Sequence, residues 1–270
     1  ATIGTDHIDL PWCSARGIAV ANAPGCNAPA VAQYVFGAIA ALKPDFIGDL
    51  TIGIVGVGHV GRIVERWARS LGMRVLRCDP PREHAEGGDG WHTINEIARE
   101  ADVITIHTPL TTDAPYATRH IINESWLASL VRRPLLINAA RGAIIDTPAL
   151  VSAIDKGLIG RTAIDCWEGE PCISDALLQR ADVATPHIAG YSREGKWRAS
   201  QMILDSLTAF FGLPHIALRE QAPAPVPETV AASAIAASYN PLAEDTPALK
   251  AAPYAFESLR NGYVLRSELH

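Results

Sequence analysis

Short apolar runs alternate with longer stretches of helical spacing through the middle of the chain. Six of these runs have the length and the aliphatic content of buried strands. They occupy residues 51–58, 74–79, 102–108, 135–140, 161–166 and 182–187. Because strands that alternate with helices form βαβ units, this pattern predicts an α/β fold built on a parallel sheet.

Two stretches outside this alternation predict long helices. Residues 27–42 carry apolar side chains at helical spacing with few charges, so this helix should be mostly buried, with Asn27 as its N-cap and Pro29 in its first turn. Residues 193–211 return to helical spacing. Residues 213–247 are rich in Pro and Ala with little periodicity, and we expect a domain boundary there.

Composition narrows the class of partner. The chain has 270 residues, 48% of them hydrophobic, which is enough for a substantial core and about two domains. Its net charge is −6 and no run of Lys or Arg is present, so we expect a small-molecule partner and no nucleic acid. No apolar stretch of about 20 residues occurs, so we expect no membrane span.

The cysteines indicate the redox compartment of the protein, and the first residues indicate how the chain begins. The cysteines form no CxxC pair and are odd in number, which favours free thiols in the cytoplasm. They are Cys13, Cys26, Cys78, Cys166 and Cys172. The chain starts at Ala1 without an initiator Met, so we expect either a processed product or a segment of something longer.

A glycine motif follows the first predicted strand and opens an amphipathic helix, which is the context of a dinucleotide site. Gly56 permits a tight turn, Gly58 lets the backbone approach a pyrophosphate, and Gly61 allows close packing of helix and strand. Asp79 ends the next predicted strand, where a carboxylate accepts hydrogen bonds from ribose hydroxyls. This pattern predicts NAD rather than NADP as the cofactor.

Two features of this region leave alternatives open. Asp79 is also in place to cap a helix after a glycine-rich turn, without any role in nucleotide binding. Arg82 is in place to meet the 2'-phosphate of NADP, although we expect it to lie along the adenine or to face solvent.

Three polar motifs end later strands, at the edge of the sheet where open α/β folds bind ligands. They are residues 138–142 (NAARG), 165–171 (DCWEGEP) and 185–191 (TPHIAGY). Oxidation of a secondary alcohol needs a base, a cation for the substrate carboxylate and a group that orients the base. His187, Arg141 and Glu170 provide these three groups.

Each of these residues also has a structural interpretation. His187 taken alone is more typical of a buried structural histidine, and Arg141 of a surface salt bridge. Gly142 beside Arg141 should leave room for substrate. Glu168 lies two residues before Glu170 and competes with it for the orienting role.

The order of these motifs resembles the D-2-hydroxyacid dehydrogenase family along nearly the whole chain. The resemblance makes His187 the acid/base, Glu170 its hydrogen-bonded carboxylate and Arg141 the ligand of the substrate carboxylate, with no metal. It also implies further cofactor contacts, from His59, Val60, Thr108, Ala139, Ala140, Asp165 and Gly190. Two residues depart from the family pattern: Gln33 stands where Glu is usual, and Ala140 where Cys is common.

Four stretches resemble one branch of that family, which acts on a phosphorylated 2-hydroxy acid as a homodimer. They are residues 24–35, 107–120, 187–196 and 256–263. In this branch Tyr191 would bind the substrate, and the segment of the family that precedes Ala1 is expected to hold the phosphate; Tyr191, Arg193 and Lys196 are the first candidates if residues of this chain hold it. Two alternatives stay open: a dehydrogenase of glycerate, phosphoglycerate or another 2-hydroxy acid, and a catalytically silent NAD-binding fragment, co-repressor or sensor.

The resemblance implies a Rossmann-type doubly wound sheet, an incomplete substrate domain and a small C-terminal dimerisation domain. Residues 1–43 would be a remnant of the substrate domain with a crossing helix, and residues 44–188 the NAD-binding domain. Residues 189–212 would return to the substrate domain, and residues 213–270 would form the dimerisation domain.

Overall fold

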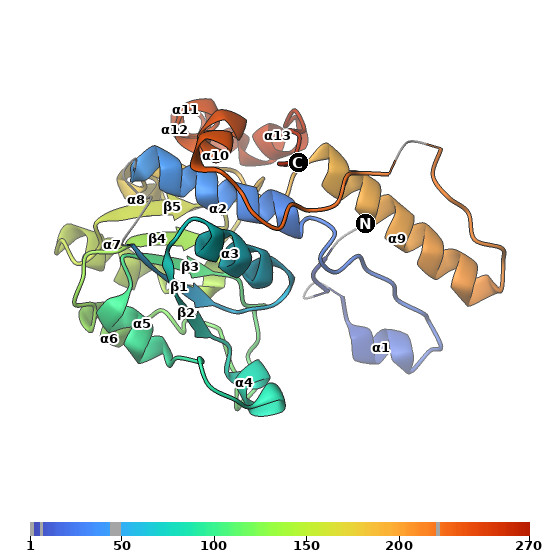
Figure 1. Ribbon diagram of the computed structural model, residues 1–270, viewed down its shortest axis with the longest axis horizontal. Helices are drawn as coiled ribbons and strands as arrows, with labels where there is room; N and C mark the ends of the chain where they lie inside the picture. Colours follow the sequence, from blue (N-terminus) through green and yellow to red (C-terminus); the bar gives the residue numbers. More distant parts are fainter. Residues whose placement is uncertain (1–2, 6–7, 44–49, 220–221) are drawn as a thin grey trace.

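A parallel sheet lies between helices in the left half of Figure 1. The computed structural model describes residues 3–5, 8–43, 50–219 and 222–270. These residues form six parallel strands in the order β2-β1-β3-β4-β5-β6. The strands are β1 (Thr51–Val55), β2 (Arg74–Cys78), β3 (Val103–Ile106), β4 (Leu135–Asn138), β5 (Arg161–Ile164) and β6 (Val183–Ala184). The predicted Rossmann-type α/β fold and all six strands are confirmed, although each strand ends earlier than predicted because loops of the site follow it.

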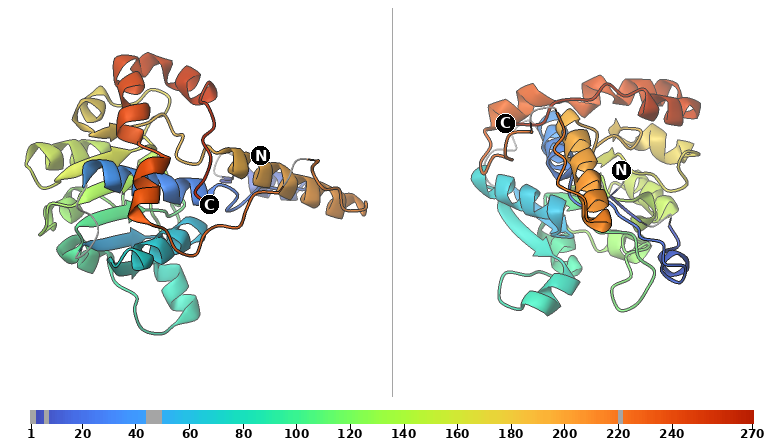
Figure 2. Two further views of the ribbon diagram at one scale, coloured as in Figure 1. Left: turned by 45° about the horizontal axis from the view of Figure 1, so that its top comes forward. Right: turned by 90° about the vertical axis from the view of Figure 1, so that its right-hand side faces the viewer.

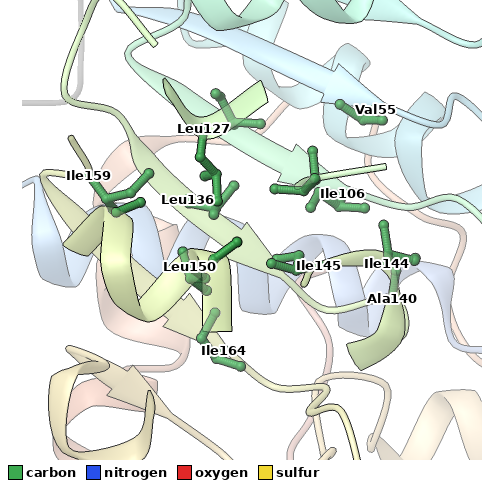
Figure 3. Packing of buried hydrophobic residues seen from close by; sticks show 14 of the residues in the cluster. Val55, Ile106, Leu127, Leu136, Ala140, Ile144, Ile145, Leu150, Ile159 and Ile164 are labelled. Atoms are coloured by element: carbon green, nitrogen blue, oxygen red, sulfur yellow. The ribbon is translucent and has the colours of Figure 1, made fainter. Parts of the chain in front are cut away.

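Helices cover both faces of the sheet. One face is covered by α2 (Ala28–Leu42) and α3 (His59–Ser70), which share a buried cluster with residues of the strands. The other face carries α5 (Ile94–Glu100), α6 (Glu124–Ala128), α7 (Thr147–Asp155) and α8 (Asp175–Arg180). Figure 3 shows this second cluster, with Leu136 and Ile164 of the sheet among Leu127, Leu150 and Ile159.

The two long helices appear where the pattern predicts them. Helix α2 is buried along most of its length, and Pro29 lies in its first turn. Asn27 is its N-cap residue, but the Asn27 side chain makes no capping hydrogen bond and packs against Gly190 instead. Helix α9 spans Arg193–Phe211; the Ser192 hydroxyl accepts from Gly195 N at 2.9 Å, and Gly212 ends the helix with a positive φ.

Helix α9 extends away from the sheet, on the same side as the N-terminal segment (Figures 1 and 2). That segment contains the short helix α1 (Leu10–Ser14). A small apolar cluster joins it to α9, with Ala23 and Cys26 against Ala199. The predicted boundary between residues 43 and 44 and the predicted start at Ala1 lie outside the described residues.

The C-terminal segment packs onto the sheet domain. It contains α10 (Ala232–Ser238), α11 (Pro241–Glu244), α12 (Thr246–Ala251), η2 (Pro253–Ala255) and α13 (Phe256–Asn261). Ile235 is fully buried in the cluster of α2, and Leu249 is fully buried in the cluster of the opposite face. The Thr246 hydroxyl accepts from Ala184 N at 3.1 Å, so this segment also covers the edge strand β6.

Three smaller observations complete the fold. All five cysteines are free thiols. Among the residues that the structure describes, no helix combines the length and apolar character that crossing a bilayer requires. The remaining elements are α4 (Pro80–Glu86) after β2 and the short 3-10 helix η1 (Gly142–Ile144) after β4.

The burial of Ile235 predicts that the C-terminal segment unfolds together with the sheet domain. We expect Ile235→Ala to lower the free energy of unfolding by about 2 to 5 kcal/mol, because it leaves a cavity against α2. Chemical denaturation followed by circular dichroism measures this change. The control is Ile216→Ala, whose side chain is exposed, and an equal effect of the two changes would contradict the packing described above.

Candidate active site at the carboxyl edge of the sheet

The order of the strands reverses between β1 and β3. From β1 the chain passes to β2 on one side, and then returns to pair β3 with the other side of β1. Ligands of open α/β sheets bind in the crevice at such a switch point, beyond the carboxyl ends of the strands. Gly56 follows β1 and Thr108 follows β3, so both lie at this crevice.

The three glycines of the motif have different surroundings. Gly56 has a φ of +92°, and a Cβ atom there would lie 2.7 Å from the backbone of His107 and Thr108. A Cβ atom on Gly61 would lie 2.2 Å from Gly56 O, so only glycine lets α3 approach β1. A Cβ atom on Gly58 would meet no atom within 4 Å, so the space beside Gly58 is open.

Asp79 joins the glycine turn to the following helix. Its carboxylate accepts from Val57 N at 2.8 Å and from Arg82 N at 3.2 Å, so it holds the turn and caps α4 at once. Arg82 pairs with Glu86 at 2.8 Å and also donates to Val57 O. Asp79 therefore caps α4, as the structural interpretation predicted. This contact is compatible with a further role at the ribose.

The crevice has the features that a dinucleotide requires. The first turn of α3 has no side-chain cap, so its backbone N–H groups are available to a pyrophosphate. Within the described structure, the buried Thr108 hydroxyl and His107 Nδ1 have no hydrogen-bond partner. Burial lowers the pKa of His107 to about 3, so this imidazole is neutral. These residues fit the NAD predicted from the sequence.

The other residues predicted to bind the cofactor differ in how many contacts they make within the protein. His59 packs against Gly25, Val60 is half-buried, and a Cβ atom on Gly190 would collide with Asn27. Ala139 and Ala140 follow β4. The carboxylate of Asp165 is fully buried and accepts from Thr185 Oγ1, Ile188 N and Ala189 N at 2.7 to 3.0 Å. Asp165 therefore organises its own loop, and its cofactor contact stays a prediction.

His187 and Glu170 are directly bonded. Glu170 Oε2 lies 2.7 Å from His187 Nδ1, and Glu170 Oε1 accepts from Trp167 N at 2.7 Å. The carboxylate thus fixes one ring nitrogen, Nδ1. Glu168 instead pairs with His120 at 2.7 Å, so Glu170 is the one of the two glutamates that is bonded to His187.

The environment of His187 favours its protonated form. Cys166, where its thiol is ionised, and Glu170 and Asp165 raise the pKa of His187 above its usual range, against burial, which lowers it. The Cys166 sulfur, a carboxylate oxygen of Glu170 and a ring nitrogen of His187 lie within 4.8 Å of one another. Burial raises the pKa of Cys166 to about 11, so the thiol is neutral at pH 7 and Glu170 is the charged partner that matters there.

Arg141 and His187 line the same pocket, which has a volume of about 160 Å³. Arg141 donates from Nη1 to Ala140 O at 2.8 Å. The expectation that Gly142 leaves room for substrate is wrong: a Cβ atom there would lie 1.9 Å from the carbonyl carbon of Trp167. That space is filled by backbone, so Gly142 lets the Arg141 loop touch the Trp167 loop.

Two arginines of the C-terminal segment also approach this site, and the sequence interpretation missed both. Arg260 interacts with Tyr191 and Glu170, and its Nε atom is buried without a partner among the described residues. Arg266 contacts the loop that follows His187. Arg260 lies within the 256–263 motif, but a motif gives no spatial relation to residues about seventy positions earlier.

Comparison with known proteins identifies the family. Residues 38–189 match the model of the NAD binding domain of D-isomer specific 2-hydroxyacid dehydrogenases. The chain belongs to the D-isomer specific 2-hydroxyacid dehydrogenase family. The NAD-binding domain of the family thus includes the glycine turn, Asp79 and the His187–Glu170 pair.

Several relatives align with almost all of this D-isomer specific 2-hydroxyacid dehydrogenase. The erythronate-4-phosphate dehydrogenase of Porphyromonas gingivalis is 43% identical over 97% of this chain and 75% of its own length. That of Bacteroides thetaiotaomicron is 44% identical over 99% of this chain and 78% of its own length. Among solved structures, D-lactate dehydrogenase from Aquifex aeolicus, in complex with NAD and lactic acid, is 28% identical with a TM-score of 0.66, covering 78% of this chain and 74% of that one.

The contacts of Asp79 predict how the chain selects its cofactor. We expect Asp79→Asn to keep the cap of α4 but to relax discrimination against NADP, because the 2'-phosphate no longer meets a negative charge. Both changes should also weaken NAD binding, since an amide has only one oxygen and cannot accept from Val57 N while it caps α4, and alanine accepts from neither N–H group. Dissociation constants for both nucleotides, from fluorescence titration, decide the matter. Preference of the unmodified chain for NADP would contradict the assignment and give Arg82 the phosphate.

Proposed function

We propose that the chain oxidises 4-phospho-D-erythronate to (R)-3-hydroxy-2-oxo-4-phosphobutanoate with NAD, in the supply of pyridoxine 5'-phosphate (vitamin B6). The observation that carries the reaction type is the bonded His187–Glu170 pair in one pocket with Arg141. The substrate follows from the relatives, which bear the name erythronate-4-phosphate dehydrogenase. The stretches at residues 24–35, 107–120 and 187–196 support the same substrate.

Each group of the pair and its neighbour has one task in this proposal. His187 takes the proton of the substrate hydroxyl through Nε2, and Glu170 holds the ring and stabilises the imidazolium. Arg141 binds the substrate carboxylate, for which a planar guanidinium is well matched. NAD, when bound, accepts the hydride from the substrate carbon that bears this hydroxyl group.

The substrate phosphate requires cations within reach of the substrate. Lys196 lies over the ring of Tyr191, with Nζ 4.5 Å from the ring centre, so the two present a charge and a hydroxyl together. Arg260 adds a second charge beside Tyr191. Arg193 is a weaker candidate than the sequence implies, because its guanidinium donates to Ser267. We infer that Tyr191 contacts the substrate, with Lys196 and Arg260 as its charged neighbours.

We also propose that the chain works as a homodimer in the cytoplasm. Tyr254 and Val264 of the C-terminal segment are 91% and 87% exposed, which is unusual for apolar side chains of this size and supports an interface there. The free thiols support a reducing compartment. Sedimentation measures the mass: a dimer that Val264→Asp dissociates supports the interface, and a monomer at all concentrations contradicts it.

The experiment that tests the function is a substrate panel. NADH formation is followed by absorbance with 4-phosphoerythronate, erythronate, glycerate and phosphoglycerate. Preference for 4-phosphoerythronate supports the proposal, whereas preference for a glycerate places the chain in another branch of the family. Binding of NAD without oxidation of any 2-hydroxy acid would leave only a nucleotide-binding role.

Removal of the base should lower turnover without loss of NAD binding. We expect His187→Asn to reduce kcat by about 10² to 10⁴, the usual contribution of a placed acid/base, and Glu170→Gln to reduce it less. Steady-state kinetics and a titration with NAD measure the two effects separately. Turnover of the His187 variant close to that of the parent chain would remove the central claim.

The raised pKa of His187 predicts the direction of the pH dependence. Oxidation needs the neutral imidazole, and that form becomes more abundant as pH rises toward the raised pKa of His187. We therefore expect kcat/KM for oxidation to rise from pH 7 to pH 10, and kcat/KM for reduction of the 2-oxo acid to fall as His187 loses its proton. In Glu170→Gln the rising limb should move to lower pH, because one charge that raises the pKa is gone. A flat profile for oxidation would contradict this assignment.

A further inference from the structure

The loop that carries His187 is held from two opposite sides. His187 has a φ of +57°, a conformation that non-glycine residues rarely adopt without support. On one side the buried carboxylate of Asp165 accepts from Ile188 N at 2.7 Å and from Ala189 N at 3.0 Å. The carbonyl groups of the same two residues point the other way, toward the C-terminal segment.

Arg266 receives those carbonyl groups. Its Nη1 donates to Ile188 O at 3.1 Å, and its Nη2 donates to Ala189 O. The three other donors of the guanidinium also have acceptors: Ala30 O at 3.0 Å, Tyr263 Oη at 3.1 Å and Gln33 Oε1 at 3.4 Å. All five N–H groups of the side chain are thus in use, and the Tyr239 ring lies 4.4 Å below its centre.

Arg266 is itself fixed by its neighbours in the C-terminal segment. Arg193 N donates to Arg266 O at 3.0 Å, which ties the segment to the start of α9. Two residues later, Glu268 is almost fully buried and accepts from Ser192 Oγ at 2.6 Å and from Arg198. The buried Glu268 carboxylate, with these partners, fixes the backbone of the segment that carries Arg266.

We propose that Arg266 is a positioning residue for His187, which it serves by binding the carbonyl groups of Ile188 and Ala189 opposite Asp165. This role rests on the proposed function of His187 as acid/base. The peptide groups of the loop lie between an anion on their N–H side and a cation on their C=O side, so both charges oppose rotation of the peptides. His187 Nδ1 then stays within 2.7 Å of Glu170.

The chemistry of the side chain makes a specific demand at this position. Lysine brings the same charge but only three donors around one atom, so it cannot reach carbonyl groups on α2 and on the loop at once. Gln33 accepts from Arg266 and donates to Ser267 O at 3.1 Å, which an ionised Glu cannot do. This pairing explains why an amide is accommodated at residue 33.

The test compares Arg266→Gln and Arg266→Lys with the parent chain. The matched control is Arg161→Gln, which removes an exposed ion pair with Asp182 near the opposite edge of the sheet. We expect both changes at Arg266 to lower kcat, by on the order of 10²-fold for Arg266→Gln, with the KM for NAD nearly unchanged. Guanidinium ion at non-denaturing concentration should restore part of the kcat of Arg266→Gln, because it fills the vacated position.

A second readout needs no substrate. In chains labelled with ¹⁵N-histidine, the His187 signal is assigned by its loss in His187→Asn. Its titration should move to lower pH in both Arg266 variants, as contact with Glu170 weakens, and stay unchanged in Arg161→Gln. Cys166 and Asp165 also raise the pKa of this imidazole, and neither is changed in these variants.

The outcomes separate this proposal from the proposed function. Folded Arg266 variants with the kcat and the His187 titration of the parent chain would overturn the positioning role. If Arg266→Gln fails to fold, an unshifted titration in Arg266→Lys would overturn it equally. If the parent chain oxidises no 2-hydroxy acid, the proposed function fails, whereas the titration still decides whether Arg266 positions His187.

Discussion

The buried carboxylate of Asp165 is the interaction on which the site depends. It follows β5, and it binds Thr185 after β6 together with the backbone of the next loop. A carboxylate so far from water is costly unless its oxygens are satisfied, and three short hydrogen bonds satisfy them. The same bonds force the chain to turn directly after His187. The buried Asp165 carboxylate therefore links the ends of β5 and β6 and fixes the position of the His187 imidazole.

Charge in this site is arranged through the backbone as much as through side chains. Asp165 binds N–H groups, Arg266 binds C=O groups, and Glu170 binds both a backbone N–H and the imidazole. The peptide groups between these residues are hydrogen-bonded on both sides, so each fixed side chain restrains the position of the next. This arrangement explains how a histidine in an unfavourable backbone conformation is kept in a single orientation.

The sequence predicted what depends on local pattern. The strands follow from short apolar runs, and α9 covers residues 193–211, which helical spacing predicted. The pairing of His187 with Glu170 followed from motif order, although their catalytic roles stay predictions. The contacts of Arg266 were not predictable, because its acceptors at residues 30 and 188 are separated from it by 236 and 78 positions. The error at Gly142 has the same origin, since its neighbour Trp167 comes from another loop.

The contact at Gly142 has a consequence for motion of the enzyme. Backbone touches backbone where the loop of Arg141 meets the loop of Trp167, and Trp167 N is bonded to Glu170. Sliding between these loops would separate surfaces that leave no space for an intervening atom. Arg141 and Glu170 thus belong to one rigid body, and any closure of the cleft around a bound acid has to turn about hinges elsewhere in the chain. The spacing of the two loops that carry Arg141 and Glu170 is then the same before and after such a closure.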